Sequence, residues 1–337
     1  DVRDTWVLKL GLERPLPALP AQIPLPLAFL RGMERETGFV RILSGDGVKV
    51  EPAATPGLLQ IDVTELPKSL QGGSAPRSLA YRFPARPETA IVAVEALEPR
   101  VSVEQGTRVT IRAEGTDVVV GALYKVERAG IFGVSFALPP GLDVLAVRVK
   151  GVAYNDHKIR ETGEERLLEV AFGDRLLGAA HVEIDARAVT PLPGEGEDVA
   201  KEVQFPVPLI SVRGANHLRG YLAIHLDPSL EHRELDRVAL TPLDAAAPAA
   251  LEPPATPGAA LPLVHRFEHH EGGSALEVAL RRRDPQVRAT VETALRVEPD
   301  RTRMATTLRY DVRYRGVGTL RFTAPLAVKD RMHVDLE

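Results

Sequence analysis

Apolar and polar residues alternate with a period of two along most of this chain, and that period predicts β-strands. The clearest case is the stretch 122–139. There Tyr124 and Phe136 belong to an apolar series that alternates with charged and small residues, and Gly130 divides the series. We therefore predict two antiparallel strands joined by a tight turn at Gly130, with one face buried.

The same pattern returns in residues 308–325. Tyr310 and Phe322 take the apolar positions, and Gly316 divides the series. We expect each aromatic residue to be buried like its counterpart in the first stretch, and the two glycines to occupy the same turn. A recurrence over so long a separation is typical of an internal duplication.

Further matches follow in the same order. Leu27–Gly32 (LAFLRG) resembles Leu209–Gly214 (LISVRG) at an offset of 182 residues, and Leu79–Phe83 resembles Leu263–Phe267 at an offset of 184. Loops that lengthen between fixed strands account for such a drift. We predict two tandem units with a period of about 184 residues, which should superpose strand for strand.

The repeat also sets the expected domain limits. Turn signals recur at about 8 to 12 residues, which predicts an all-β fold of tandem antiparallel, Ig-like β-sandwich subdomains. Residues 1–14 are interpreted as the last strand of a preceding unit, because Trp6–Leu10 resembles Ala180–Ile184. The expected subdomains are 15–98 and 99–192 in the first unit, and 193–284 and an incomplete 285–337 in the second.

An incomplete sandwich exposes unpaired backbone at a sheet edge. We therefore expect Trp6–Leu10 to pair with such an edge, either in its own first unit or in the second unit of a neighbouring molecule.

Little of the sequence favours helix. Thr64–Leu70 predicts one short turn capped by Thr64, and Leu235–Ala247 is either a strand or a helix. Pro15–Pro26 predicts an extended connection, and Leu27–Leu30 a short strand.

Composition narrows the function classes. The formal net charge is −4 and the pI is about 6.2, so no basic face for nucleic acid is expected. No apolar run approaches the ~20 residues that span a bilayer. The absence of cysteine excludes disulfides and thiolate sites. The first residue is Asp1, and no signal peptide is present, which we interpret as a trimmed piece of a longer protein.

One cluster has the residue types of a metal site. His265, His269 and Glu271 alternate along a predicted strand, so they could share a face and hold zinc or nickel. The aligned positions of the first unit are Tyr81 and Ala85, which places the cluster outside the shared scaffold. A solvated strand end is therefore the favoured interpretation, and no metal or cofactor is expected.

Three other groups contain residue types that could support catalysis or ligand binding. Asn155–His157 (NDH) offers a carboxylate and an imidazole, but a turn built by Asn and Asp is the favoured interpretation. Arg31–Gly32 and Arg213–Gly214 recur in both units, which favours a bulge or turn over an anion site. Arg281–Arg283 is typical of a charged edge strand. Phosphate loops and nucleophile elbows are absent from the sequence.

These observations favour a non-catalytic segment of a larger protein, acting as a structural spacer, scaffold or adhesive surface. Its expected partners are other domains of that protein or neighbouring copies, in the cell envelope or outside the cell. One alternative is a glycan- or peptide-binding module that uses loops such as Gln71–Pro76 or Ala245–Ala260. Another is a hydrolase-type enzyme with a site between subdomains, which a deep cleft at His157 or His265 would favour.

Overall fold

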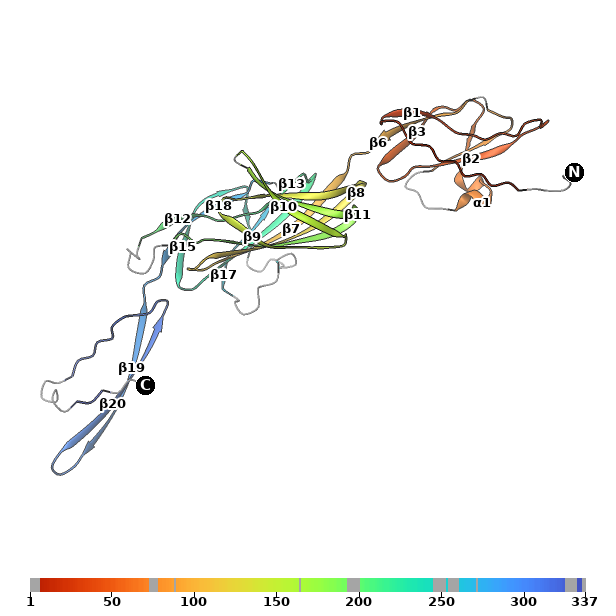
Figure 1. Ribbon diagram of the computed structural model, residues 1–337. Helices are drawn as coiled ribbons and strands as arrows, with labels where there is room; N and C mark the ends of the chain where they lie inside the picture. Colours follow the sequence, from red (N-terminus) through yellow and green to blue (C-terminus); the bar gives the residue numbers. More distant parts are fainter. Residues whose placement is uncertain are drawn as a thin grey trace.

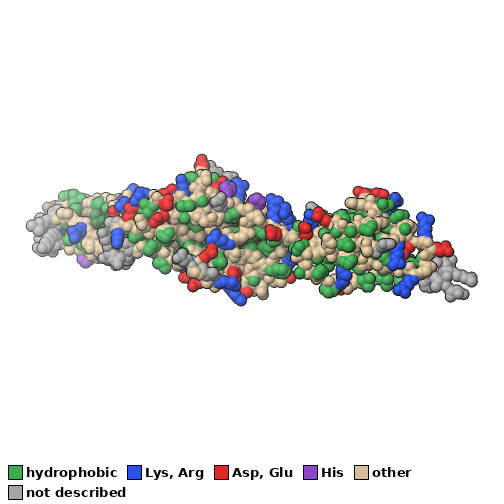
Figure 2. Space-filling model, turned by 90° about the horizontal axis from the view of Figure 1, so that it is seen from above, with side chains coloured by type: hydrophobic (Ala, Val, Ile, Leu, Met, Phe, Trp, Pro, Cys, Tyr) green, Lys and Arg blue, Asp and Glu red, His purple; other side chains and the backbone are tan. Residues whose placement is uncertain are grey.

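The computed structural model describes residues 7–72, 78–87, 89–163, 165–192, 201–244, 253, 261–270, 272–324 and 332–334. An N-terminal lobe, a central body and a two-stranded ribbon follow one another along an elongated molecule (Figures 1 and 2). Regular structure is almost entirely strand, and all but one of the strand pairings are antiparallel. The prediction of an all-β fold of antiparallel sheets is confirmed.

The N-terminal lobe holds two three-stranded sheets, in the orders β1-β6-β3 and β2-β5-β4. Its strands are β1 (Ala21–Pro24), β2 (Gly38–Leu43), β3 (Val48–Ala54), β4 (Leu59–Ile61), β5 (Ser78–Phe83) and β6 (Ile91–Ala96). Small apolar clusters form around Val92 and Val94 in one sheet and around Tyr81 in the other. Leu27–Leu30 is not a strand, whereas β1 lies inside the proline-rich connection.

The helical turn near Thr64 is present, but its cap differs from the prediction. It comprises the 3₁₀ helix η1 (Val63–Glu65) and the short helix α1 (Lys68–Gln71). Asp62 is the N-cap: its carboxylate accepts a hydrogen bond from the Thr64 backbone N–H at 2.8 Å, while Glu65 accepts one from the Asp62 N–H. Asp62 rather than Thr64 therefore caps the turn, because its side chain and that of Glu65 form a reciprocal capping box.

The central body contains a nine-stranded sheet and a three-stranded sheet. Its strands are β7 (Arg100–Ile111), β8 (Thr116–Leu138), β9 (Leu142–Lys150), β10 (Tyr154–Thr162), β11 (Glu165–Ala188), β12 (Val203–Pro206), β13 (Ser211–Arg213), β14 (His217–Leu226), β15 (Leu230–Val238), β16 (Thr241–Pro242), β17 (Leu263–His269) and β18 (Ala275–Arg282). The large sheet has the path β10-β11-β8-β7-β14-β17-β16, with β13 beside β8 and β9 beside β11, and the smaller sheet is β12-β18-β15. The described part of Leu235–Ala247 is therefore strand and connection, not helix.

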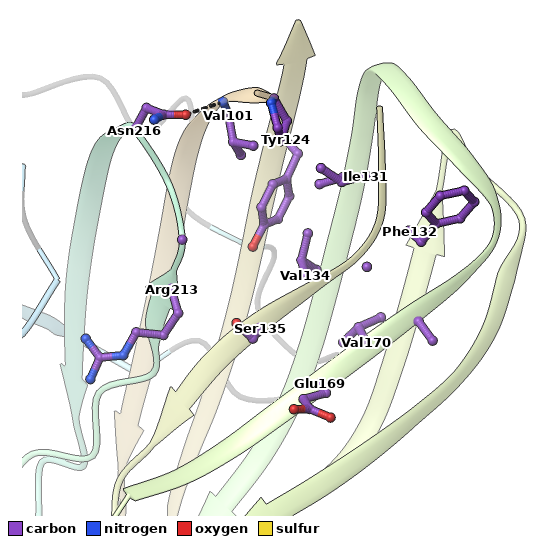
Figure 3. Close-up of a pocket in the computed structure, with 14 residues that line it drawn as sticks. Val101, Tyr124, Ile131, Phe132, Val134, Ser135, Glu169, Val170, Arg213 and Asn216 are labelled. Atoms are coloured by element: carbon purple, nitrogen blue, oxygen red, sulfur yellow. Dashed lines mark hydrogen bonds between the residues drawn. The ribbon is translucent and has the colours of Figure 1, made fainter. Parts of the chain in front are cut away.

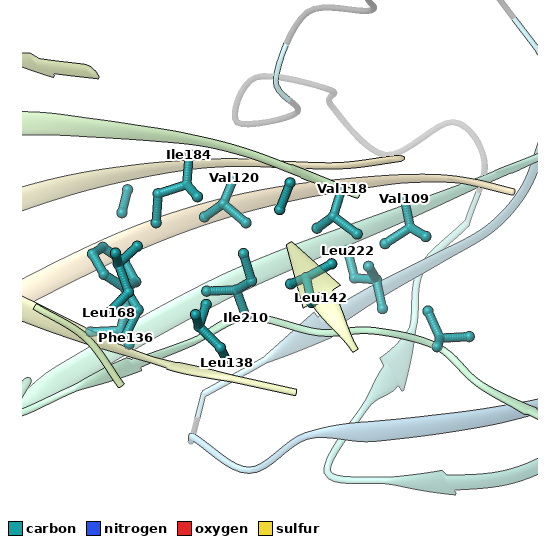
Figure 4. Close-up of a cluster of buried hydrophobic side chains, with 14 of the residues drawn as sticks. Val109, Val118, Val120, Phe136, Leu138, Leu142, Leu168, Ile184, Ile210 and Leu222 are labelled. Atoms are coloured by element: carbon teal, nitrogen blue, oxygen red, sulfur yellow. The ribbon is translucent and has the colours of Figure 1, made fainter. Parts of the chain in front are cut away.

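One hydrophobic core runs through this body (Figure 4). It joins Val118 and Ile184, from the predicted second subdomain of the first unit, to Leu222, from the predicted first subdomain of the second. The large sheet likewise crosses the expected limit between residues 192 and 193. These two subdomains thus share a single core, because neither covers its own apolar face.

The predicted hairpin around Gly130 is wrong. Residues 116–138 form a single long strand, β8, which bends where Arg128 takes a positive φ of 69°. Pairing with β7 stops at Glu127, while β11 continues alongside with shifts of register. A Cβ on Gly130 would lie 2.9 Å from the Leu176 carbonyl oxygen, so the glycine permits close approach of β11. Since β11 and β13 supply partners beyond the bend, the chain continues instead of reversing.

The ribbon consists of β19 (Gln286–Val297) and β20 (Thr302–Arg313), which pair only with each other. Burial of Phe136 and Tyr124 is confirmed, at 0% and 1% exposed. The same prediction for Phe322 is wrong, because that side chain is 49% exposed. Residues 314–324, with Gly316 among them, form no strand, and the described residues include no second sheet over the ribbon.

Strand order and register recur between the two halves. The order β1-β6-β3 returns as β12-β18-β15. Ala21 pairs with Val94, and Val203 pairs with Leu280, so the two partners move by 182 and 186 residues. The same two displacements relate β2-β5-β4 to β14-β17-β16. These correspondences support the duplication, which stays a prediction, and they correct the offset of residues 79–83 from 184 to 186.

The ribbon repeats the register of β7 and β8 in the same way. Arg100 lies opposite Glu127, and Gln286 lies opposite Arg313, a displacement of 186 residues for both strands. The bend recurs as well, because Tyr314 has a φ of 72° at the position equivalent to Arg128. A non-glycine residue in this conformation is uncommon, so its recurrence at Arg128 and Tyr314 is a further observation that supports the predicted duplication.

Candidate functional site

The two halves of the chain meet where β14 adds to the edge of β7. This pairing is parallel and runs from Ser102 opposite His217 to Ile111 opposite Leu226. Alongside it, β13 pairs with the second half of β8, where Val212 lies opposite Phe136. We call this contact of β7 and β8 with β13 and β14 the joint. It is the place where one predicted unit is attached to the next.

Apolar side chains fill the joint. Val109 of β7, Val118 of β8 and Leu222 of β14 belong to one cluster and are at most 2% exposed (Figure 4). Full burial of such a side chain stabilises a fold by about 1.5–3 kcal/mol. The joint is therefore an integral part of the core and not a flexible linker.

Two polar side chains fix the register of the joint, the exposed Asn216 and the buried Gln105. The Asn216 backbone N–H donates to the Val101 carbonyl at 2.8 Å, and the Asn216 side-chain oxygen accepts from the Val101 N–H at 2.7 Å. The Gln105 amide, 1% exposed, donates to the Ile210 carbonyl at 2.8 Å. Sequence reasoning missed both side chains. One signal in the sequence could have revealed Gln105: it is a polar residue at a position where the alternation along β7 calls for an apolar one.

An open cleft of about 470 Å³ lies beside the joint. Its walls come from β8, β11 and the turn after β13, and Figure 3 shows Tyr124, Ile131, Val134 and Val170 directed toward it. The Tyr124 ring packs edge-on against Phe136, with centroids 6.2 Å apart. Its buried hydroxyl has no hydrogen-bond partner in the described part of the chain, and burial raises the pKa of Tyr124.

The charged residues that line this cleft are already paired. Glu169 forms an ion pair with Arg160 at 3.1 Å, and Arg213 with Glu165 at 2.6 Å. The cleft lining contains no histidine. The cleft lining thus combines apolar side chains with one buried phenol and two ion-paired charges.

The predicted metal ligands are not brought together. His265 and His269 share one face of β17, as expected, but Phe267 stands between them. At about 3.3 Å per residue their Cα atoms are about 13 Å apart, too far to share an ion. Glu271 lies outside the described residues. The described residues contain no group of three or more His, Cys, Asp or Glu side chains that could hold a metal.

His265 instead contacts a histidine of the smaller sheet. Its Nε2 lies 2.8 Å from the Nε2 of His232, and its ring stacks on Phe267. Burial lowers the pKa of both imidazoles. The His265 ring lowers the pKa of His232 further, whereas at His265 the Glu234 carboxylate raises the pKa and the Arg237 guanidinium lowers it. A neutral pair in which one ring donates to the other suits this contact between two sheets.

His269 has a structural role opposite a glycine. It lies across from Gly220 in the β14–β17 pair, and its ring occupies the space that a Cβ on Gly220 would need. In the N-terminal lobe Phe83 covers Gly38 in the same manner. An aromatic ring that packs over a cross-strand glycine fills the gap left by the missing side chain. The counterpart of His269 is therefore Phe83, not Ala85.

The remaining candidates also lie in structural settings. Asn155–His157 belongs to strand β10, so the predicted turn is wrong; a register shift with β11 follows Tyr154. The Tyr154 hydroxyl contacts His157 Nδ1 at 2.6 Å on an exposed face. Gly32 and Gly214 both have positive φ angles, 76° and 73°, as a turn requires. Within the described ranges, the structure has no helix of the length and hydropathy needed to cross a bilayer.

Comparisons with known proteins give no family. The sequence matches no family and no curated protein. Among solved structures the chain is similar to native leukotriene A4 hydrolase from Saccharomyces cerevisiae, at 10% identity and a TM-score of 0.30, over 53% of this chain and 29% of that one. It is also similar to an M1 zinc metallopeptidase from Deinococcus radiodurans, at 12% identity and a TM-score of 0.28, over 69% and 51%. The chain thus spans less than a third of the hydrolase and about half of the metallopeptidase. Likeness this weak carries no conclusion about activity.

Proposed function

We propose that the chain is a non-catalytic segment of a larger protein, in which tandem β-units form a structural spacer, scaffold or adhesive surface. Its partners in this proposal are other domains of that protein or neighbouring copies, in the cell envelope or outside the cell. The observation that carries the proposal is the joint. Its buried apolar core and side-chain hydrogen bonds attach one predicted unit to the next without a flexible hinge.

The recurring registers support this proposal. A protein that serves as a spacer gains length by repeating a unit that contacts its neighbours, and it needs no polar site common to the copies. The candidate chemical groups of the second unit differ from their counterparts in the first: His269 replaces Phe83, and His265 replaces Leu79. What the copies share is strand pairing, the bend and the alternation of apolar residues.

The cleft favours one alternative, a peptide- or glycan-binding module. Its apolar walls and the Arg213 guanidinium beside them offer a surface to an extended ligand, whereas the Tyr124 hydroxyl lies buried within the wall. A ligand bound there would bridge β8 and the turn that carries Arg213. The alternative is therefore specific enough to be tested by one substitution.

Two measurements on the intact chain test the proposal. Small-angle X-ray scattering should give an elongated particle, and screens of glycans, peptides and hydrolase substrates should give neither saturable binding nor turnover. Saturable binding that Arg213→Ala weakens would establish the binding alternative, because Arg213 lines the cleft and its side chain is exposed. Turnover of a substrate would overturn the non-catalytic proposal.

A further inference from the structure

We propose that the ribbon binds a second copy of this chain head to tail, and that the second copy's N-terminal lobe reproduces the joint. The inference rests on the proposed function and names its partner and its surface. The second copy would add β2 to the free edge of β19 and its residues 7–12 to the free edge of β20. Both additions extend a sheet by main-chain pairing.

The ribbon has an apolar face with no cover among the described residues. Its large apolar side chains are 37–73% exposed, whereas the equivalent positions of β7 and β8 are at most 7% exposed. The exposed set is Val287, Val291, Leu295, Val297, Met304 and Val312, and the equivalent buried set is Val101, Gln105, Val109, Ile111, Val118 and Val126. A two-stranded ribbon alone is marginally stable in water, so this face requires a partner.

The partner for β19 is indicated by the joint itself. β14 uses one edge for β17 and the other for β7, whereas its counterpart β2 pairs only with β5. The free edge of β2 therefore corresponds to the edge that β14 presents to β7. By the same displacement β19 corresponds to β7. Within the chain Tyr221 lies opposite Gly106, so between two copies Phe39 should lie opposite Glu292.

The partner for β20 follows from the start of the chain. In the central body Val182 and Ile184 of β11 are buried opposite Ala122 and Val120 of β8. Residues 6–10 resemble residues 180–184 of β11 in sequence, and the described residues 7–12 form no strand. Leu8, Leu10 and Leu12 alternate along this stretch and are at least 67% exposed. Placed on β20 in the β11 register, these three leucines would cover the apolar face.

Both complementary surfaces lie on one chain, and they lie at opposite ends of it (Figure 1). Among the described residues no strand pairs with the outer edges of the ribbon, whereas a second copy carries counterparts of both β14 and β11. Contact between two different surfaces does not close on itself, so the assembly should extend beyond a dimer. An unrelated partner would have to match two edges at once.

Disulfide trapping tests the register directly, because the sequence has no cysteine to interfere. The chain carrying both Phe39→Cys and Glu292→Cys should give a reducible ladder of dimers and larger species under mild oxidation. The control pairs Phe39→Cys with Arg296→Cys, which lies four residues, or about 13 Å, out of register. A ladder from the first pair alone is expected. No ladder, or equal ladders from both pairs, would overturn the proposal.

Sedimentation of the intact chain tests the surface independently. Molecular mass should rise with protein concentration, and Leu295→Asp should abolish the rise while leaving the melting of the free chain unchanged. Thr290→Asp, on the face equivalent to the exposed Glu104, should leave association intact. A chain that stays monomeric, or that associates despite Leu295→Asp, contradicts this docking. If the chain is an elongated monomer that binds no ligand, the docking proposal fails and the proposed function stands. If the chain associates and also binds a ligand, the proposed function fails and the docking proposal stands.

Discussion

The β7–β8 pair and the β19–β20 ribbon have the same register and the same bend. The β7–β8 pair lies in the hydrophobic core, whereas the apolar side chains of the ribbon are exposed to solvent. Val109 is 0% exposed in the first pair, and its counterpart Leu295 is 61% exposed in the second. The 12-residue pairing therefore forms in both settings, because cross-strand alternation and the turn are local. Burial depends on partners that are distant in sequence.

The difference widens beyond the bend. After Arg128 the chain continues as strand to Leu138, where β11 and β13 lie on either side. After Tyr314 the equivalent residues form no strand, although their apolar alternation is similar. Alternation thus indicates which face would be buried, while neighbouring strands decide whether a strand forms at all.

The largest expected difference concerns the two phenylalanines. Phe136→Ala should lower the free energy of unfolding of the central body by about 3–5 kcal/mol, because it leaves a cavity in a close-packed core. Phe322→Ala should change stability by less than about 0.5 kcal/mol in the monomer, since that side chain is half exposed. Urea denaturation monitored by circular dichroism measures both. Equal costs at the two sites would contradict the structural difference between the copies.

Local pattern predicted more of the fold than of its connections. The all-β class and the burial of Tyr124 and Phe136 follow from period-two alternation. The turn at Gly130 was wrong because a glycine inside an alternating series fits a hairpin and a bent long strand equally well. The choice between them is made by β11, which lies further along the chain and places Leu176 opposite Ile131.

The candidate site shows the same limit. Alternation placed His265 and His269 on one face correctly, but a strand separates such residues too widely for one ion. Their actual contacts, His232 and Gly220, come from other strands and carry no local signal. Asn216 was missed for a similar reason, since a loop asparagine is common and its contact with Val101 becomes visible only in the folded chain.

A smaller difference in the free energy of unfolding should distinguish the joint from the equivalent position of the N-terminal lobe. Asn216→Ala removes the acceptor for the Val101 N–H and should cost about 0.5–1.5 kcal/mol, the usual net contribution of one hydrogen bond, because the Asn216 side chain is exposed. Asn216→Asp keeps an acceptor oxygen and should restore most of that loss. Glu34→Ala, at the equivalent position of the N-terminal lobe, should change monomer stability by less than about 0.5 kcal/mol. Thermal or urea unfolding of the three variants gives the comparison, and similar losses at both positions would show that Asn216 does not hold the joint.

The smallest expected effect is a pH dependence of the central body that the N-terminal lobe should not share. Burial lowers the folded-state pKa of both His232 and His265 below the ordinary histidine value of about 6.5. As pH falls through that ordinary value, the unfolded chain binds protons that the folded chain does not, so stability of the central body should fall until the pH drops below the lowered pKa values. Val50 and Leu79 occupy the equivalent positions of the first unit, which should lack this dependence.

The matched variant takes the residues of the first unit, His232→Val with His265→Leu. It should flatten the change in urea midpoint between about pH 7.5 and 5.5, a window above the range in which most carboxylates titrate. Glu234 and Arg237 face His265 with opposite effects on its pKa, so neither alone should abolish the dependence. If the double variant keeps the full slope, the proton uptake arises elsewhere and the histidine pair is only a packing contact. If the slope disappears, the pair is an acid-labile contact between two sheets that the second unit has and the first replaces with apolar side chains.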